Sequence, residues 1–319
     1  MHTALQTRRL GTTDLDITAI GFGAWAIGGG DWKFGWGDQD DALSISAIRR
    51  AIEHGINWID TAAVYGFGHS EEVVARALDG IRERPYVFTK CGLVPSGKND
   101  GEPVENISRA SIVAECEASL RRLRVEAIDL YQIDWPTDEI ADIDEAWSAM
   151  LELKTSGKVR NIGVSNFDVD EMRRAERIAP IGSLQPPYSL VKRKVEGGIL
   201  EHCREQNIGV IAYAPMQSGL LSGAMTKERA ASLPANDWRS KSPDFTEPKL
   251  TRNLELVERL RAVGASHGRS PGEVAIAWTL RDPVVTGAIV GGRSPEQVDG
   301  VIGAASFRLT PEEIAQIEG

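Results

Sequence analysis

Residues 57–66 read NWIDTAAVYG, an apolar run that ends in a carboxylate and then crosses a short loop to a phenol and a glycine. If residues 58–60 form a strand, Trp58 and Asp60 share one face, and an acid at the strand end is presented where a ligand can reach it. Tyr65 follows within one loop. The alternative is that Asp60 caps the next turn and Tyr65 is a half-buried aromatic residue. The choice depends on whether the pattern recurs along the chain.

The segments before this stretch predict a hairpin, a strand and a helix. Residues 8–19 alternate around a glycine-containing turn, residues 20–26 form a glycine-punctuated strand, and a helix begins at the acidic cap of residues 40–41 and stops at Gly55. Residues 21–26, GFGAWA, match the glycine pattern of dinucleotide-binding folds, but that motif must open directly into a helix. Because residues 28–37 intervene here, we reject the Rossmann interpretation.

The segments after the stretch alternate between helix and strand to the end of the chain. The further strands are predicted at 86–90, 128–134, 161–165, 183–185, 209–213 and 284–290. Helices are predicted at 70–78, 108–123, 146–153, 169–178, 199–206, 251–266 and 271–281, with Ser70 as part of a cap, and residues 222–248 are predicted to form a long polar loop. With 20–26 and 58–60 this makes eight strands, the pattern of a (β/α)₈ TIM barrel with an N-terminal β-hairpin, in a single domain over residues 1–319.

The composition is that of an ordinary globular protein, with 42% hydrophobic and 26% charged residues. A formal charge of -10 argues against nucleic acid or an anionic membrane as the partner. The cysteines, Cys91, Cys116 and Cys203, have no metal or disulfide spacing, and the sequence contains neither a signal peptide nor a long apolar run. We therefore expect a cytoplasmic protein with no metal site, and we favour a monomer.

The predicted strand ends carry polar or aromatic residues that should converge, because barrel sites lie at the C-terminal ends of the strands. In order they are Trp25, Asp60 with Tyr65, Lys90, Asp134 with Trp135, Ser165 with Asn166, Gln185, Tyr213, and Gly291, Gly292 and Arg293. A lysine in such a mouth needs an anion, for which Asp60 is suited, and the pair is expected to lower the pKa of Tyr65 so that it can act as a proton donor. No serine or cysteine nucleophile with a histidine is evident.

These residues occur in segments that resemble the aldo-keto reductase superfamily over essentially the whole chain. The matching segments are DTAxxYG at 60–66, Lys90, LYQIDWP at 130–136, GVSNF at 163–167, Gln185, YAP at 213–215, SGLLSG at 218–223 and GGRSPEQ at 291–297. The resemblance implies a barrel that binds an extended nicotinamide dinucleotide without a Rossmann fold and transfers a hydride to a small-molecule carbonyl substrate.

The resemblance also implies roles for individual residues. Tyr65 is the proton donor, tuned by Lys90 and Asp60, and Tyr213 stacks on the nicotinamide. The residues implied to bind the cofactor are Trp25, Ser165, Asn166, Gln185, Tyr213, Pro215, Gln217, Gly219, Leu220, Gly223, Gly291, Arg293, Ser294 and Gln297. We expect NADP(H), because Arg293, Ser294 and Gln297 follow the last strand and no carboxylate stands there to hold a ribose hydroxyl.

One departure from the family pattern concerns the substrate. Asp134 stands where the family usually has histidine, and we expect burial and Asp60 to keep it substantially protonated, so that it donates to the substrate oxygen. Gly300 and Val301 replace the usual adenine-contacting pair. The pocket is expected to be open and edged by Trp25, Trp32, Trp36 and Trp135, which suits sugar-like or ring substrates. Asp134 leaves two alternatives, a reductase of activated C=C bonds and a weakly catalytic regulatory subunit like those that accompany potassium channels.

Overall fold

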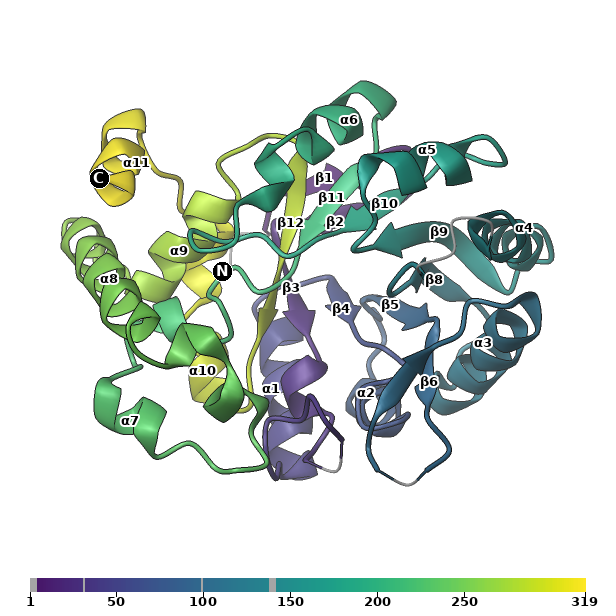
Figure 1. Ribbon diagram of the computed structural model, residues 1–319, viewed down its shortest axis with the longest axis horizontal. Helices are drawn as coiled ribbons and strands as arrows, with labels where there is room; N and C mark the ends of the chain where they lie inside the picture. The colour runs from purple at the N-terminus through teal and green to yellow at the C-terminus, as the bar shows by residue number, and fades with distance from the viewer. Residues whose placement is uncertain (1–4, 31, 99, 138–141) are drawn as a thin grey trace.

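The computed structural model describes residues 5–30, 32–98, 100–137 and 142–319. Eight parallel strands close into a barrel in the order β10-β11-β12-β3-β4-β5-β8-β9 (Figure 1). Their bounds are β3 (Ile20–Gly23), β4 (Trp58–Asp60), β5 (Tyr86–Cys91), β8 (Ile128–Ile133), β9 (Val159–Ser165), β10 (Ser183–Gln185), β11 (Gly209–Ala212) and β12 (Val285–Gly291). The prediction of a (β/α)₈ barrel is confirmed.

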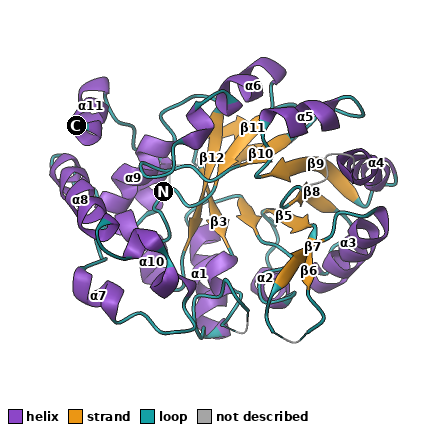
Figure 2. Ribbon diagram, viewed as in Figure 1, coloured by secondary structure: helices purple, strands orange, loops and turns teal. Residues whose placement is uncertain are grey.

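Helices surround the barrel and leave the strands inside (Figure 2). They are α1 (Asp41–Glu53), α2 (His69–Leu78), α3 (Arg109–Leu123), α4 (Asp142–Thr155), α5 (Val169–Glu176), α6 (Ile199–Gln206), α7 (Lys227–Ala231), α8 (Lys249–Ala265), α9 (Pro271–Thr279), α10 (Pro295–Asp299) and α11 (Pro311–Glu318). Some N-termini follow the sequence signals: Asp40 accepts from the Ala42 amide at 2.7 Å before α1, and Ser270 and Glu273 form a capping box at the start of α9.

The predicted N-terminal hairpin is present as the antiparallel pair β1 (Thr7–Arg9) and β2 (Asp16–Thr18). Its turn fits closely against the barrel, because a Cβ at Gly11 would lie 2.2 Å from the amide nitrogen of Gly209 at the start of β11. Leu10 and Ile17 pack in one apolar cluster with the inward-facing Trp58. The hairpin therefore closes the N-terminal end of the barrel, and the opposite end is left for a site.

Two local predictions were wrong, and one hairpin was not predicted. The first strand ends at Gly23, and Trp25 begins a 3-10 helix, Trp25–Ile27, after the Ala24 amide donates to the Asp60 carbonyl. Ser70 lies inside α2 and does not cap it; its hydroxyl donates to the Ala24 carbonyl at 3.0 Å, and Gly68 is the N-cap. An unpredicted hairpin, β6 (Leu93–Pro95) and β7 (Pro103–Glu105), separates β5 from α3.

The segment 222–248 is more ordered than the predicted polar loop. It contains α7 and the 3-10 helices Trp238–Lys241 and Pro243–Phe245. The reason is a small apolar cluster under this segment, in which Met225 and Phe245 pack with Leu220 and Leu250 from its two flanks. The sparse apolar residues of the segment are therefore sufficient to fix its path across the barrel mouth.

The described residues were compared with the requirements of a membrane span, a metal site and a disulfide. None of their helices is long and apolar enough to cross a membrane. Over the same residues no group of histidine, cysteine and acidic side chains is arranged to hold a metal ion. Cys91, Cys116 and Cys203 are buried free thiols.

A close approach between the Gly21 backbone and the Trp58 side chain inside the barrel gives a test of the packing. A Cβ at Gly21 would lie 2.2 Å from the ring of Trp58, which is fully buried, 5.3 Å from Phe88 between ring centres. We expect Gly21→Ala to lower the free energy of unfolding in urea by about 1–3 kcal/mol. The control is Gly197→Ala, whose new Cβ would approach nothing closer than 3.4 Å. Equal stability of the two variants would contradict this packing.

Candidate active site

Lys90 and Asp60 form a buried ion pair at the mouth of the barrel. Lys90 Nζ, from β5, lies 2.7 Å from Asp60 Oδ2 at the end of β4, and the two residues are 1% and 2% exposed. The same nitrogen donates to the Thr61 carbonyl at 2.9 Å and to Tyr65 Oη at 3.1 Å. Burial lowers the pKa of Lys90, but the neighbouring Asp60 and Tyr65 raise it by more than burial lowers it. The net pKa is therefore raised, and the ammonium stays charged.

The Tyr65 hydroxyl accepts a hydrogen bond from Lys90, so its own proton remains to be donated elsewhere. The expectation that the ion pair lowers the pKa of Tyr65 is wrong for this structure. Burial raises the pKa of the phenol above its ordinary value; Lys90 lowers it, as expected, but Asp134 and Asp60 add to the increase. Tyr65 is therefore a neutral donor near physiological pH, and Lys90 limits rather than reverses the effect of burial.

Asp134 follows β8 at the same end of the barrel. Its backbone is fixed on both sides, because its amide donates to the Cys91 carbonyl at 2.8 Å and its carbonyl accepts from Asn166 Nδ2 at 2.9 Å. Burial raises the pKa of Asp134 to about 6; Lys90 opposes this shift and Asp60 adds to it. The direction agrees with the sequence prediction, and it makes Asp134 a group that changes charge near neutrality.

The polar residues that end β9 and β10 lie beside this carboxylate. Ser165 Oγ donates to the Gln185 carbonyl at 2.8 Å, and Asn166 Nδ2 contacts Ser165 Oγ at 3.1 Å. Tyr213, after β11, donates its hydroxyl to Asn166 Oδ1 at 2.9 Å, and Gln185 Nε2 donates to Asp60 Oδ1 at 2.8 Å. The structure thus joins the candidate amide-binding residues and the ion pair in one hydrogen-bonded network.

The loop after β11 has an unusual backbone. Ala214, Gln217 and Ser218 all adopt left-handed conformations, with φ of 54°, 45° and 54°, as do Gly219 and Gly223. Such conformations cost energy in residues other than glycine and are found preferentially at functional sites. The backbone of this loop is therefore held in a shape that its sequence alone would not choose.

Several side chains of the same loop make their contacts within the protein. Pro215 is buried, and Leu220 belongs to the apolar cluster around Phe245. The Gln217 amide donates to Asp244 at 2.7 Å and accepts from Ser189. Any contact of this loop with a ligand would therefore come chiefly from its backbone.

Arg293 lies after β12 and reaches across to the first loop of the barrel. Its guanidinium donates to the Gln39 side chain, to the Trp36 carbonyl at 3.1 Å and to the Asp38 carbonyl, and its amide donates to Gln297 Oε1 at 2.9 Å. Ser294 begins the turn into α10, and Gly291 is the last residue of β12. The four predicted residues at this strand end are therefore contiguous in space.

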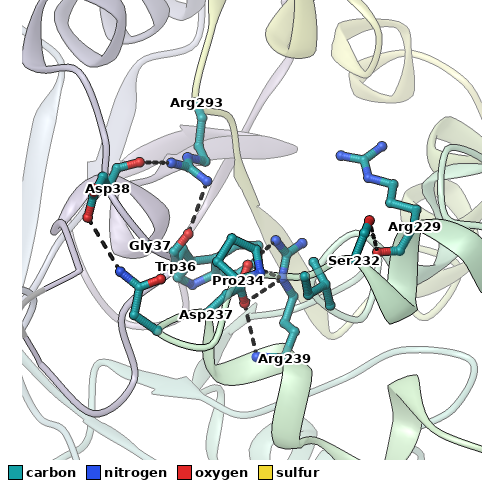
Figure 3. A pocket seen from close by; sticks show the side chains of 11 residues that line it. Trp36, Gly37, Asp38, Arg229, Ser232, Pro234, Asp237, Arg239 and Arg293 are labelled. Atoms are coloured by element: carbon teal, nitrogen blue, oxygen red, sulfur yellow. Dashed lines mark hydrogen bonds and ion pairs between the residues drawn. The ribbon is translucent and has the colours of Figure 1, made fainter.

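A cavity of about 440 Å³ opens beside Arg293 (Figure 3). Its lining comprises Trp36, Gly37, Asp38, Arg229, Ser232, Leu233, Pro234, Asn236, Asp237, Arg239 and Arg293. Arg239 is paired with Asp237 at 2.6 Å, whereas no carboxylate in the described part of the chain lies within ion-pair distance of Arg293. Uncharged oxygen atoms therefore hold the Arg293 guanidinium in place, and its positive charge is not paired with a carboxylate.

Aromatic side chains cover the mouth next to Tyr65. Trp25 stacks on Trp238 with ring centres 5.5 Å apart, and the Trp32 ring centre lies 5.9 Å from that of Tyr65. The expected open rim is only partly observed: Trp32 is 6% exposed and Trp135 is 43% exposed. Trp25, Trp36 and Trp238 pack against one another, so their rings contact each other on this side of the mouth instead of edging an open pocket.

A family model described as the aldo/keto reductase family matches residues 19–319. This chain belongs to the aldo-keto reductase family. Members use nicotinamide cofactors, and this aldo-keto reductase is an oxidoreductase that acts on carbonyl compounds.

Known relatives cover nearly all of the chain. It is 36% identical over 307 residues to the aldo-keto reductase YhdN of Bacillus subtilis, covering 95% of this chain and 90% of that protein. It is 34% identical over 311 residues to the NADH-specific methylglyoxal reductase of Escherichia coli, covering 94% of each. Among solved structures, a glycerol dehydrogenase from Gluconobacter oxydans matches with a TM-score of 0.87 and 38% identity, covering 99% of this chain and 95% of that one.

Several residues of this aldo-keto reductase site were not identified from the sequence. Gln132 is fully buried beside Asp60 and Gln185, and its position two residues before Asp134, within the strand predicted at 128–134, was a usable signal. Trp238 and the Asp237–Arg239 pair come from the segment that was predicted as a polar loop. No local pattern places them at the site, because it is their contacts with Trp25 and Trp36 of the distant first loop that bring them there.

The titration of Asp134 should be visible in the stability of this reductase. Its folded pKa, about 6, exceeds the ordinary value of 3.8, so the folded state binds the proton more tightly and its stability falls as pH rises between these values. We expect Asp134→Asn, which lacks this titration, to gain about 2–3 kcal/mol over the parent between about pH 4 and pH 7. The measurement is urea unfolding at several pH values.

A surface carboxylate supplies the control. Arg174 holds the pKa of Asp144 below its usual range, so Asp144 contributes stability that is lost as pH falls. The difference between Asp144→Asn and the parent should therefore change with pH in the opposite direction. A pH-independent difference for Asp134→Asn would show that Asp134 is not perturbed.

Proposed function

We propose that this protein uses NADP(H) to reduce the carbonyl group of aldehydes or ketones to an alcohol, with Tyr65 as the proton donor. The observation that supports this best is the use of the three Lys90 N–H groups, which donate to Asp60, Thr61 and Tyr65. This arrangement leaves the Tyr65 proton free, and among the described residues no acceptor takes it. A substrate oxygen at the mouth would be that acceptor.

The residues would act as follows. The bound nicotinamide cofactor would supply the hydride. Tyr65 donates its proton as negative charge develops on the substrate oxygen, and Lys90 stabilises the phenolate that remains, since a fixed cation in a buried site acts strongly on a developing charge. Asp60 keeps Lys90 charged and in place. Below pH 6 Asp134 is neutral and offers a second donor to the same oxygen.

The side chains fit a nicotinamide dinucleotide phosphate. Ser165, Asn166 and Gln185 supply hydroxyl and amide groups suited to a carboxamide, and Tyr213 supplies an aromatic face. The support for a phosphate is Arg293, which lines the cavity without an ion-pair partner in the described chain. One relative is named as NADH-specific, so family membership alone does not decide between NADPH and NADH. The proposed preference for NADPH therefore depends on residues of this chain such as Arg293.

A second candidate is reduction of an activated C=C bond. The observation that favours it is the raised pKa of Asp134, which places a neutral acid where the family usually has histidine. The third reading, a weakly catalytic regulatory subunit, is disfavoured by the complete contact network among Asp60, Lys90 and Tyr65. An enone tested beside the aldehydes separates the first two reactions.

Replacing Tyr65 tests the proton donor. We expect Tyr65→Phe to reduce kcat for NADPH-dependent aldehyde reduction by roughly 10²–10⁴-fold, because the general acid is lost. The Kd for NADPH, measured by fluorescence titration, should stay near the parental value. Tyr86→Phe, at the opposite end of β5, is the control and should retain the parental rate. A Tyr65→Phe rate within about threefold of the parent would exclude this role.

Replacing Arg293 tests the cofactor preference. We expect Arg293→Ala to raise the KM for NADPH by about tenfold or more and to spare NADH, because only NADPH carries the 2′-phosphate. Arg308→Ala is the matched control: the Arg308 guanidinium, like that of Arg293, donates to backbone carbonyls, here those of residues 304, 305 and 307, but it does not line the cavity. Equal effects on both cofactors would mean that Arg293 supports the first loop and does not recognise phosphate.

A further inference from the structure

The Asp134 carboxyl has no hydrogen-bond donor among the described residues. Asp134 is 7% exposed, and although its backbone is fixed by Cys91 and Asn166, none of the described residues donates to its side-chain oxygens. A carboxylate at the barrel mouth that no protein group satisfies takes its hydrogen bonds from solvent or from a bound molecule. The Asp134 carboxyl oxygens are therefore free to accept hydrogen bonds from a bound molecule.

The neighbouring Lys90 ammonium does not donate to the Asp134 carboxyl. All three protons of Lys90 are already donated, to Asp60, Thr61 and Tyr65, so its field reaches Asp134 but its hydrogen bonds do not. Asn166, the nearest amide donor, contacts the Asp134 backbone carbonyl instead of the carboxylate. The protein therefore leaves the Asp134 carboxyl to water or to a substrate that enters the mouth.

We propose that Asp134 accepts a hydrogen bond from a substrate hydroxyl beside the reacting carbon, so that this enzyme selects hydroxy-carbonyl compounds and vicinal diols over simple aldehydes and alcohols. The inference rests on the proposed function, because it places the reacting oxygen at Tyr65. Both groups lie at the same end of the barrel, because Asp134 follows β8 and Tyr65 Oη accepts from Lys90 on the neighbouring strand β5. A hydroxyl can donate to a carboxylate, whereas the hydrogen of a plain alkyl chain cannot.

The charge state of Asp134 sets the strength of this selection. The ionised form only accepts, so it favours a hydroxyl; the neutral form also donates and discriminates less. Selectivity for the hydroxylated substrate should therefore rise as pH increases through the Asp134 titration. The titratable groups whose charges act together with Asp134 are Asp60, Tyr65, Lys90, Cys91, Glu115 and Tyr213.

The experiment compares two three-carbon substrates, glyceraldehyde and propanal, with NADPH. The readout is the ratio of their kcat/KM values from about pH 5 to about pH 8, a range that spans the titration of a perturbed carboxyl. Any effect of pH or mutation on the shared chemical step cancels in this ratio. Aldehyde hydration is the same for every variant, so it cancels when variants are compared.

The parent ratio should rise by about tenfold across this range, the size expected for a charged hydrogen bond. In Asp134→Asn and Asp134→Ala the ratio should be lower at high pH and independent of pH. Asp129→Asn is the matched control, because Asp129 is also a carboxylate with a raised pKa on β8, but it lies at the other end of the strand. It should keep the parental profile.

A further variant separates Asp134 from its titrating neighbour. Burial raises the pKa of Glu115 to about 7, and its carboxylate accepts from the Gly92 amide at 3.2 Å. Glu115→Gln should retain the rise of the ratio with pH. If the ratio rises in the Asp134 variants, or is flat in the parent, the inference is overturned even though both aldehydes are reduced. If neither aldehyde is reduced, the proposed function itself fails.

Discussion

The ion pair between Lys90 and Asp60 is the interaction on which the rest of the site depends. Removing two charges from water costs several kcal/mol for each ion, and the attraction between them compensates only when the remaining hydrogen-bonding groups are satisfied. Here they are satisfied: Lys90 also contacts Thr61 and Tyr65, and Asp60 accepts from Gln185. A network of this kind needs side chains from several strands at once, and a closed barrel provides them.

The two ends of the barrel are built for different tasks. At the N-terminal end, the hairpin around Gly11 packs into the sheet and completes the apolar interior around Trp58. At the C-terminal end, polar side chains replace apolar ones, and backbone strain collects in the loop after β11. The apolar packing at the N-terminal end stabilises the fold. This stability allows the C-terminal end to hold buried charges and left-handed residues, which do not stabilise the fold by themselves.

The sequence predicted the barrel well, because each strand and helix has a local period and most helices have a cap such as Asp40. It also predicted which strand ends carry polar groups, since Asp60, Lys90 and Asp134 all terminate apolar runs. It could not predict the contact of Trp238 with Trp25, which joins segments far apart in the chain. The pKa of Tyr65 was predicted in the wrong direction, because the extent of burial depends on the complete tertiary structure.

The three hydrogen bonds of Lys90 have a consequence for an enzyme that handles aldehydes. A lysine amine adds to an aldehyde and forms an imine only when it is unprotonated and its lone pair is free. Asp60 raises the pKa of Lys90, and each of its N–H groups is held by an oxygen atom in a site that is 1% exposed. Lys90 is thus chemically inert toward electrophiles, and the contacts that position its charge also protect the enzyme from covalent inactivation by its own substrates.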